Sequence, residues 1–314
     1  MNVLTVTMNP ALDTSTHAGF VVPKKKIRCS SLSYAPGGGG INVSRAIKKL
    51  GSQSTALFLS GGNNGKKIEQ LLTQEKVDFI PIDSGQNVRE NLMVQDERTG
   101  NVYRFAMPGP EIEEKSWRRV LDALNDFSPT PNYLVASGSL PPGVPDDFYA
   151  RIASFAKKND IKMVLDTSGE PLRIALEEGV DMIKPNLREI AGLLDKENLT
   201  GMELEEAARE ILRKGWCSVL IISLGAKGSL LARQDDIFEY IFPPVMPVVS
   251  AVGAGDSMVA GVIAGCEKGL WPEQAVRYGV AAGTAAAMTP GSELCRKEDT
   301  EKIFDWLNKN DGIN

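Results

Sequence analysis

Catalytic chemistry is most clearly indicated by a short stretch in which small residues lead directly into an acid. Gly253, Ala254 and Gly255 precede Asp256, and an apolar run typical of a helix follows. Glycines permit a tight turn, so the backbone amides of 253–256 can point into the space above the helix and bind an anion. Asp256 could then accept a proton from an attacking hydroxyl. The alternative is that Asp256 only caps the helix, which leaves the glycine pair unexplained.

A second glycine-rich stretch, PGGGGIN at 36–42, ends in Asn42 and leads into an apolar helical pattern. Four successive glycines would let the backbone approach a ligand closely. Taken alone, the segment is equally compatible with a flexible turn in which Asn42 is the N-cap of the following helix.

The segment KPNLREI at 184–190 places Asn186 and Glu189 three residues apart at a predicted helix start. At that spacing both side chains can face one site and hold a hydrated Mg²⁺. The same spacing defines a capping box with Asn186 as cap, and spacing alone favours that interpretation. Two glycine turns after predicted strands, at 137–143 and 224–230, are weak signals individually.

Several common active sites are excluded by what the sequence lacks. In SGGNNGKK at 60–67, only three residues separate Gly61 from Gly65, and Lys67 stands where a P-loop needs a hydroxyl, so we expect a plain strand-to-helix turn. A single histidine, His17, argues against hydrolase triads and multi-histidine metal sites. The four cysteines are far apart, without a C-x-x-C pair, as suits a reducing compartment.

Composition describes an ordinary folded protein of 314 residues with 42% hydrophobic and 24% charged residues. The net charge of −5 argues against a nucleic-acid partner, because no basic field offsets phosphate charge. No basic leader and no apolar run of about 20 residues is present. We therefore expect a cytoplasmic protein with no membrane contact.

Short apolar runs alternate with helical patterns along most of the chain, which predicts a mostly parallel sheet between two helical layers. The expected strands are 3–8, 55–60, 133–138, 162–168, 181–186 and 218–225, and the expected helices are 44–50, 66–75, 146–158, 205–214 and the Ala/Gly-rich part of 257–288.

Two segments, about 14–34 and 87–107, alternate as strands with no intervening helix. We expect them to form an antiparallel patch outside the main sheet, serving as a lid or a dimer surface. The sequence therefore predicts one α/β domain over 1–314 that carries this small β patch outside its main sheet.

Polar motifs fall at predicted strand ends or in turns, where parallel α/β sheets bind their ligands. These motifs should therefore converge on one edge of the sheet. The motifs are Asp13, 37–42, 138–139, Asp166, 184–186 and 223–225.

At this point the residues resemble a known family. GGGGINVSRA (37–46) and SAVGAGDSMVAG (250–261) look like the two signatures of the ribokinase/PfkB superfamily of sugar kinases, and TMNPALD, MPGPE, SGSLPPG, LDTSGE, IKPN, SLGAKG and GVAAGTAAA extend the similarity over nearly the whole chain. The resemblance implies a three-layer ribokinase-like fold with a β lid. It also implies ATP-dependent, Mg²⁺-dependent phosphorylation of a sugar phosphate, with fructose 6-phosphate converted to fructose 1,6-bisphosphate.

The resemblance also assigns roles to individual residues. Asp256 matches the catalytic base, and Gly253, Ala254 and Gly255 match the amides of the anion hole. Residues matching sugar-phosphate contacts are Asp13, Lys26, Arg28, Gly37, Gly38, Asn42, Arg89, Arg104 and Ser139. Lys26 and Arg28 would reach the sugar from the partner subunit of a homodimer formed through the lid.

The remaining matches concern the nucleotide and cations. Nucleotide contacts correspond to Lys184, Asn186, Ser223, Gly225 and Gly228; Mg²⁺-supporting acids to Glu189 and Asp166; and a monovalent cation site, for K⁺, to Ser250, Val252, Ala286 and Gly291. Pro290 lies in that last loop and would stiffen it.

Substrate choice is the least constrained expectation. Many relatives that act on fructose 1-phosphate or tagatose 6-phosphate carry a lysine in the glycine run, G-G-K-G, whereas this chain has Gly39 there. That difference, with Lys26 and Arg28 present, favours fructose 6-phosphate. The two other sugar phosphates, a nucleoside, and a silent binding protein that keeps the fold remain alternatives.

Overall fold

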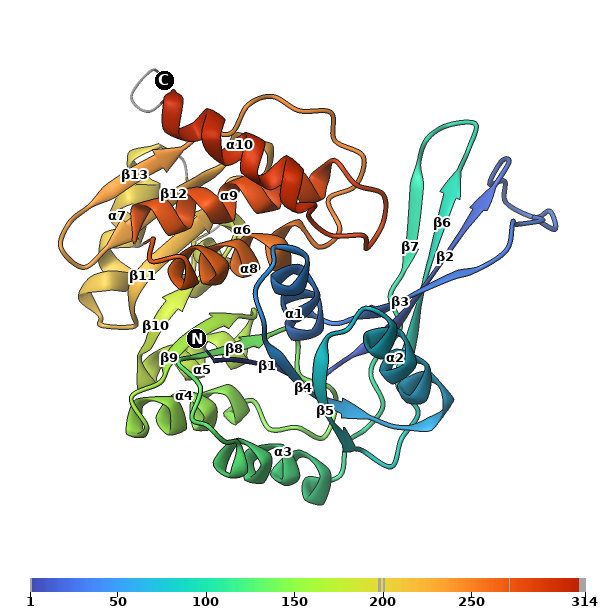
Figure 1. The fold of residues 1–314 in the computed structure, drawn as a ribbon, viewed down its shortest axis with the longest axis horizontal. Helices are drawn as coiled ribbons and strands as arrows, with labels where there is room; N and C mark the ends of the chain where they lie inside the picture. Colours follow the sequence, from blue (N-terminus) through green and yellow to red (C-terminus); the bar gives the residue numbers. More distant parts are fainter. Residues whose placement is uncertain (1, 197–198, 200, 271, 311–314) are drawn as a thin grey trace.

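The computed structural model describes residues 2–196, 199, 201–270 and 272–310. Its body is a nine-stranded sheet between two helical layers, and a separate four-stranded sheet projects from one side (Figure 1). From one edge of the large sheet to the other, the strands follow the order β13 (Phe238–Ile241), β12 (Ser229–Arg233), β11 (Cys217–Ser223), β10 (Val180–Ile183), β9 (Lys162–Asp166), β8 (Tyr133–Ser137), β1 (Val3–Thr7), β4 (Thr55–Ser60) and β5 (Asp78–Asp83). The predicted ribokinase-like α/β fold is confirmed.

From β11 to β5 every neighbouring pair of strands is parallel, while β12 and β13 are antiparallel additions at one edge. Continuous apolar runs such as Val219–Ile222 form these strands because both sheet faces are covered. In β11, Leu220 and Ile222 face one helical layer, and Val219 and Ile221 face the other. The carboxyl ends of the parallel strands therefore share one edge of the sheet.

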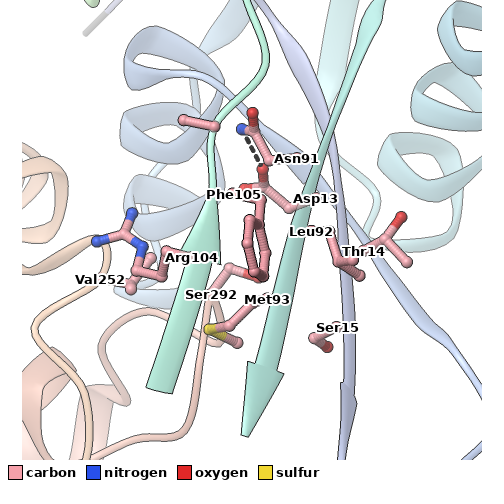
Figure 2. A pocket seen from close by; sticks show the side chains of 11 residues that line it. Asp13, Thr14, Ser15, Asn91, Leu92, Met93, Arg104, Phe105, Val252 and Ser292 are labelled. Atoms are coloured by element: carbon pink, nitrogen blue, oxygen red, sulfur yellow. Dashed lines mark hydrogen bonds between the residues drawn. The ribbon is translucent and has the colours of Figure 1, made fainter. Parts of the chain in front are cut away.

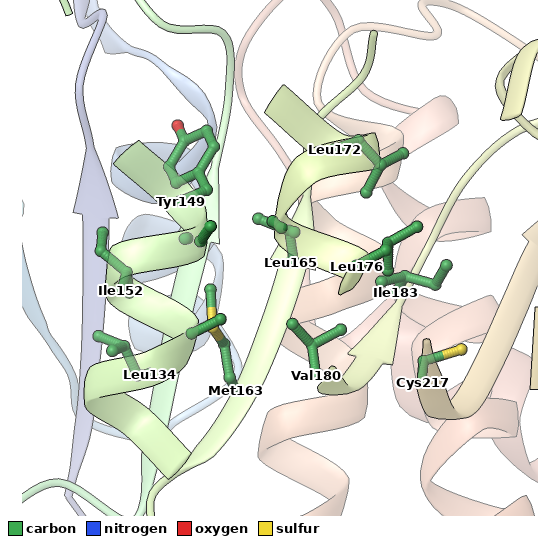
Figure 3. Close-up of a cluster of buried hydrophobic side chains, with 14 of the residues drawn as sticks. Leu134, Tyr149, Ile152, Met163, Leu165, Leu172, Leu176, Val180, Ile183 and Cys217 are labelled. Atoms are coloured by element: carbon green, nitrogen blue, oxygen red, sulfur yellow. The ribbon is translucent and has the colours of Figure 1, made fainter. Parts of the chain in front are cut away.

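The helices cover both faces of the large sheet, and each group packs its apolar side chains on its own face. One face carries α1 (Gly39–Lys49), α2 (Gly62–Gln74), α8 (Ala254–Glu267), α9 (Glu273–Ala287) and α10 (Lys297–Lys309), and the other carries α3 (Glu114–Asp126), α4 (Phe148–Lys158), α5 (Glu170–Glu178), α6 (Leu187–Leu193) and α7 (Met202–Arg213). Figure 3 shows part of the second face, where Tyr149 and Ile152 of α4 and Leu172 and Leu176 of α5 pack on the sheet.

Close packing of α8 against α9 explains the Ala/Gly-rich sequence of this region. A Cβ atom at Gly261 would lie 2.7 Å from Cβ of Ala282, and one at Gly283 would lie 3.1 Å from the carbonyl oxygen of Ala254. Such distances leave no room for a larger residue, so the glycines fix where the N-terminus of α8 lies.

The small sheet has the order β3 (Ser33–Gly37), β2 (Ala11–Ala18), β6 (Arg89–Asp96) and β7 (Val102–Phe105). The prediction that these segments form strands without a helix is confirmed, but the prediction of a wholly antiparallel patch is wrong, because the central pair, β2 and β6, is parallel. The reason lies in the large sheet: β2 continues from β1 and β6 from β5, and these two strands point the same way.

The glycine run 37–40 is required by close approach of the chain to its neighbours. Gly38 has φ 114° and is the N-cap of α1. A Cβ atom at Gly40 would lie 2.6 Å from both the Val6 carbonyl oxygen and Oγ1 of Thr7, so α1 begins directly on β1. The N-cap alternative for Asn42 is wrong, because packing of these glycines starts the helix earlier in the chain than local propensity suggests.

Gly40→Ala should destabilise the protein although alanine is the better helix former. The helical preference of about 1 kcal/mol is outweighed by overpacking against β1, for a net loss of about 1–3 kcal/mol. Denaturant unfolding measures the difference. Gly192→Ala in α6 is the matched control, since a Cβ atom there meets nothing within 4 Å; a Gly40→Ala protein as stable as wild type would contradict the packing argument.

Candidate active site

The carboxylate of Asp256 lies at the N-terminus of α8 and is hydrogen-bonded to α1. Gly253 is the N-cap residue, in the left-handed region at φ 72°, and Asp256 is the third residue of the helix, so it is not the cap. Nδ2 of Asn42 donates to Oδ2 of Asp256 at 2.9 Å. The structure thus joins the two signature stretches of the sequence through one side-chain pair.

The environment of Asp256 makes its carboxyl group unusually basic. Burial raises the pKa from 3.8 to about 6, and the nearby carboxylates of Asp166 and Asp13 raise it as well. The hydrogen bond from Asn42 and the ammonium of Lys184 act in the opposite direction. The group is ionised at neutral pH yet holds a proton far more readily than an exposed aspartate.

The first turn of α8 presents backbone amides beside this carboxylate. The amide of Gly255, like others at the start of a helix, has no partner within it and favours an anion. The amide of Ala254 makes only a long hydrogen bond, of 3.4 Å, to the Ala251 carbonyl that precedes the helix. On one side of the turn, Leu294 is packed so closely on Gly253 that a Cβ atom there would collide with it. On the other, a Cβ atom at Gly255 would lie 3.2 Å from Nζ of Lys184.

Lys184 follows β10 and lies between the carboxylates of this edge. Its Nζ is 3.3 Å from Oδ1 of Asp166, the last residue of β9, and the side chain is buried. Burial alone would lower the pKa of Lys184, but the charges of Asp166, Asp256 and Glu189 raise it overall. The ammonium is therefore held in its charged form beside the N-terminus of α8.

A pocket between the small sheet and the body holds Asp13 (Figure 2). Asp13 lies inside β2, rather than past a strand end as expected, and accepts a hydrogen bond from Nδ2 of Asn91 at 2.9 Å. Burial raises the pKa of Asp13, although Asn91 and the charges of Arg45, Arg89 and Arg104 lower it. Arg104, Val252 and Ser292 line the same pocket, which therefore combines an acid with cationic and hydroxyl groups.

Gly37, Ser139 and Arg89 are also expected to contact the sugar phosphate, but they do not line this pocket. Gly37 lies against the carboxylate of Asp13 and leaves no room for a Cβ atom. Oγ of Ser139, just past β8, accepts a hydrogen bond from Nδ2 of Asn9 at 3.1 Å. Arg89 donates to the carbonyl oxygens of Met107 at 3.0 Å and Asn9 at 3.1 Å, and burial lowers its pKa. Arg89 thus clamps the chain where the small sheet meets the body.

The predicted nucleotide residues lie at the next strand ends along the edge. The capping box favoured by the spacing is confirmed: Oδ1 of Asn186 accepts from the amides of Arg188 (2.9 Å) and Glu189 (3.0 Å), and Oε2 of Glu189 accepts from the amide of Asn186 at 2.8 Å. Burial raises the pKa of Glu189. Ser223 ends β11 and its amide donates to the Pro185 carbonyl at 2.9 Å.

A 3₁₀ turn, η1 (Gly225–Lys227), follows β11 and is closed by Gly228. Gly228 has φ 96°, and its amide donates to the Gly225 carbonyl at 3.1 Å. A side chain there would collide with the Ile241 carbonyl of β13. Gly225 and Gly228 thus shape a tight turn beside Asn186.

Lys26 and Arg28 are not brought to this site within one chain. Both are exposed in the loop between β2 and β3, at the outer end of the small sheet (Figure 1). The strand from Asp13 to Ala18 alone spans about 17 Å, so the loop that carries Lys26 and Arg28 lies far from Asp13 of the same chain.

Of the four residues expected at a monovalent cation, Ser250 and Val252 lie in the loop before α8, Ala286 lies in the last turn of α9, and Gly291 lies in the loop that follows α9. The amide of Ser250 donates to the Ala287 carbonyl at 3.1 Å, and the amide of Val252 donates to Oγ of Ser250 at 3.2 Å. Ala286 directly precedes Ala287 in the chain. Gly291 has φ 55°, and a Cβ atom there would lie 3.0 Å from Cε of Met93 in β6. Over the described part of the chain no three His, Cys, Asp or Glu side chains converge as metal ligands, so a cation here would depend on carbonyl, hydroxyl or phosphate oxygens.

Several residues of the site escaped sequence analysis. Asn9 and Asn91 orient Ser139 and Asp13, and alternation in the strands marks neither of them as special. Leu294 has φ 64°, uncommon for a side chain of its size, and packs on Gly253. This contact is visible only in the folded structure, where the residues that follow α9 pack against the start of α8.

Comparison with known proteins identifies the family. The model of the "pfkB family carbohydrate kinase" matches residues 6–299. The chain belongs to this family. Members transfer a phosphoryl group to a sugar hydroxyl, in agreement with the helix N-terminus and carboxylate described above.

The chain is 40% identical over 303 residues to the ATP-dependent 6-phosphofructokinase isozyme 2 of Mycobacterium tuberculosis, covering 96% of this chain and 89% of that protein. It is 37% identical over 310 residues to the isozyme 2 of Escherichia coli, covering 98% and 100%. The solved structure of E. coli phosphofructokinase-2 in complex with fructose-6-phosphate superposes with a TM-score of 0.92 at 36% identity, covering 98% of this chain and 99% of that one.

The E. coli enzyme has also been solved in complex with potassium (TM-score 0.93, 37% identity, covering 98% and 99%) and in a tetrameric inhibited form (TM-score 0.92, 37% identity, 98% and 99%). A 1-phosphofructokinase of Borreliella burgdorferi is 33% identical over 312 residues, 96% of each chain. No helix within the described residues has the length and apolar character needed to cross a membrane.

Asp256→Asn should stabilise the fold at alkaline pH. Because burial raises the pKa of Asp256 to about 6, the folded protein binds this proton more tightly than the unfolded chain. The associated stability is complete below pH 3.8 and is lost as the pH rises through about 6. Above that, the buried charge costs up to about 3 kcal/mol. Thermal unfolding at pH 4 and pH 8 should show a gain for Asp256→Asn only at pH 8.

Asp299→Asn is the matched control, since Asp299 holds the same third position in α10. Removing this partly exposed charge at a helix start should cost about 0.3–1 kcal/mol, the opposite sign. If Asp256→Asn were the less stable protein at pH 8, the assignment of a costly buried charge would be wrong.

Proposed function

We propose that this protein is an ATP-dependent kinase that phosphorylates fructose 6-phosphate to fructose 1,6-bisphosphate, with Asp256 as the general base. The observation that carries the proposal is the pairing of Asp256 with Asn42 at the open N-terminus of α8. This arrangement places a proton acceptor and an anion-binding turn together, as phosphoryl transfer to an alcohol requires.

Asp256 takes the proton from the attacking sugar hydroxyl as the new O–P bond forms. Its pKa of about 6 keeps it ionised at neutral pH while making it a better base than an exposed aspartate. The amides at the start of α8 and the ammonium of Lys184 bind the phosphoryl oxygens, whose negative charge they offset.

ATP would lie over the strand ends that carry Lys184, Asn186, Ser223, Gly225 and Gly228. Mg²⁺, which neutralises phosphate charge, fits Asp166 and Glu189, whose carboxylates lie near Lys184. Since Asn186 and Glu189 already form the capping box, we expect them to hold the ion through water, with phosphate oxygens as its direct ligands.

A monovalent cation, K⁺, would lie between the loop of Ser250 and Val252 and the end of α9 with its following loop, which carry Ala286 and Gly291. The hydrogen bond that joins Ser250 to Ala287 supports this placement, because it holds the loop against the end of α9. The potassium complex of the E. coli relative supports the same choice of ion.

Fructose 6-phosphate is favoured among the sugar phosphates by the packing of Gly39. A Cβ atom there would collide with Oγ of Ser137 and lie 2.7 Å from its carbonyl carbon. A lysine at this position would therefore require the end of β8 to move. The fructose-6-phosphate complex of the E. coli relative supports the same substrate.

The small sheet acts as a lid on a single kinase domain over 1–314, and pairs with a second copy in a homodimer. Exposed apolar side chains on this sheet support such pairing; they include Tyr34, Val102, Tyr103 and Phe105. In the dimer, Lys26 and Arg28 would supply the partner's site with cations for the sugar phosphate.

A coupled assay of ADP release with Mg·ATP tests the proposal. We expect a kcat/KM for fructose 6-phosphate well above those for tagatose 6-phosphate, fructose 1-phosphate and fructose. Preference for another sugar phosphate would overturn the substrate assignment and leave the role of Asp256 intact. Turnover with a nucleoside alone, or with none of these alcohols, would refute the sugar-phosphate kinase.

In the same assay, Asp256→Asn should lower kcat by about 10²–10⁴ and leave ATP binding near normal. Asp299→Asn should retain full activity. Equal kcat values for Asp256→Asn and wild type would exclude Asp256 as the base.

Mixed dimers test the lid contribution. Lys26→Ala with Arg28→Ala should raise the KM for fructose 6-phosphate much more than that for ATP, whereas Lys25→Ala, a neighbouring exposed lysine, should not. When this double variant exchanges subunits with Asp256→Asn, each hybrid gains one intact site, so the mixture should recover about a quarter of wild-type activity. Activity equal to the mean of the two parents would show that each site uses only its own chain.

A further inference from the structure

Arg45 is a buried cation one turn beyond Asn42 on α1, and no role has yet been given to it. Its side chain is only 4% exposed. Nε and one terminal nitrogen, Nη2, donate to the two oxygens of Glu75 at 2.7 and 2.8 Å. This two-point pairing fixes the plane of the guanidinium group.

The other terminal nitrogen, Nη1, faces three carbonyl-type oxygens from separate segments. It donates to the Pro36 carbonyl at 2.9 Å, to the Ser292 carbonyl at 3.3 Å and to Oδ1 of Asn42 at 3.4 Å. Pro36 leads into the glycine run, and Ser292 lines the pocket of Asp13. One side chain therefore joins three segments around the site.

The chemistry of arginine determines which way the Asn42 amide points. A guanidinium group only donates hydrogen bonds, so the Asn42 atom that faces Arg45 must be the oxygen. The amide nitrogen is then directed to the opposite side, where Asp256 accepts its hydrogen bond. With the amide reversed, an oxygen would face the Asp256 carboxylate and a nitrogen would face Arg45, and both contacts would be repulsive.

We infer that Arg45, held by Glu75, is a positioning residue that orients Asn42 toward Asp256 and keeps the glycine run and the Ser292 loop in register around the sugar site. The inference rests on the proposed role of Asp256. A lysine would keep the charge, but its single ammonium could not pair with Glu75 at two points and also reach Asn42.

The test compares Arg45→Lys, Asn42→Ala and the double variant, using the sugar phosphate that wild type converts best. We expect Arg45→Lys to lower kcat at least about tenfold, the effect of a small misplacement at a reacting centre, with the KM for ATP unchanged. The loss of kcat in the double variant should be clearly smaller than the product of the two single losses, because both changes remove the contact between Asn42 and Asp256. Arg233→Lys is the matched control: Arg233 is an ion-paired, partly buried arginine that bonds Glu273 and lies at the opposite end of β12 from the site edge.

A readout independent of turnover is the NMR signal of the Asn42 side-chain amide. It should shift in Arg45→Lys in the same direction as in Asp256→Ala, because both changes remove the hydrogen bond from Asn42 to the Asp256 carboxylate. Normal kcat in Arg45→Lys despite a lower Tm, additive effects in the double variant, or an unmoved amide signal would each overturn the inference. Absence of turnover by wild type would instead count against the proposed function, and the amide signal would still decide the role of Arg45.

Discussion

The site depends on one hydrogen bond, from Asn42 to Asp256, which joins the first turns of α1 and α8. Both helices must begin at fixed points for this bond to form. Gly40 sets the start of α1 directly on β1, and Gly261 and Gly283 set α8 closely on α9. The abundance of small residues in these segments is therefore a requirement of position, and the chemistry at the sheet edge follows from it.

Charge balance is the second requirement of this edge. Asp13, Asp166 and Asp256 repel one another, and a cluster of buried carboxylates is costly unless cations accompany it. Lys184 lies among Asp166 and the start of α8, and arginines surround Asp13. Cations therefore accompany these acids before any ligand arrives, and burial raises the pKa of both Asp13 and Asp256.

Much of this arrangement could be predicted from local patterns. The continuous apolar run of β11 and the small residues before Asp256 are local signals, and the strand and the helix start that they predict are both confirmed. Asn42 shows the limit: as a helix cap it satisfied every local rule, but tertiary packing of Gly39 and Gly40 moved the helix start. The parallel pairing of β2 with β6 and the contacts of Arg45 with Pro36, Glu75 and Ser292 depend on distant segments, which no short window of sequence displays.

The pairing of β2 with β6 also constrains how the chain can be assembled. The antiparallel pair of β2 with β3 could form as soon as those two strands were made, but the pairing of β2 with β6 requires β4, α2 and β5 to be synthesised first. Contacts between such distant segments form slowly, because a long loop must close first. The central pair of the sheet that carries Asp13 therefore forms late, and the four-stranded sheet cannot be complete until the chain between β2 and β6 has been made.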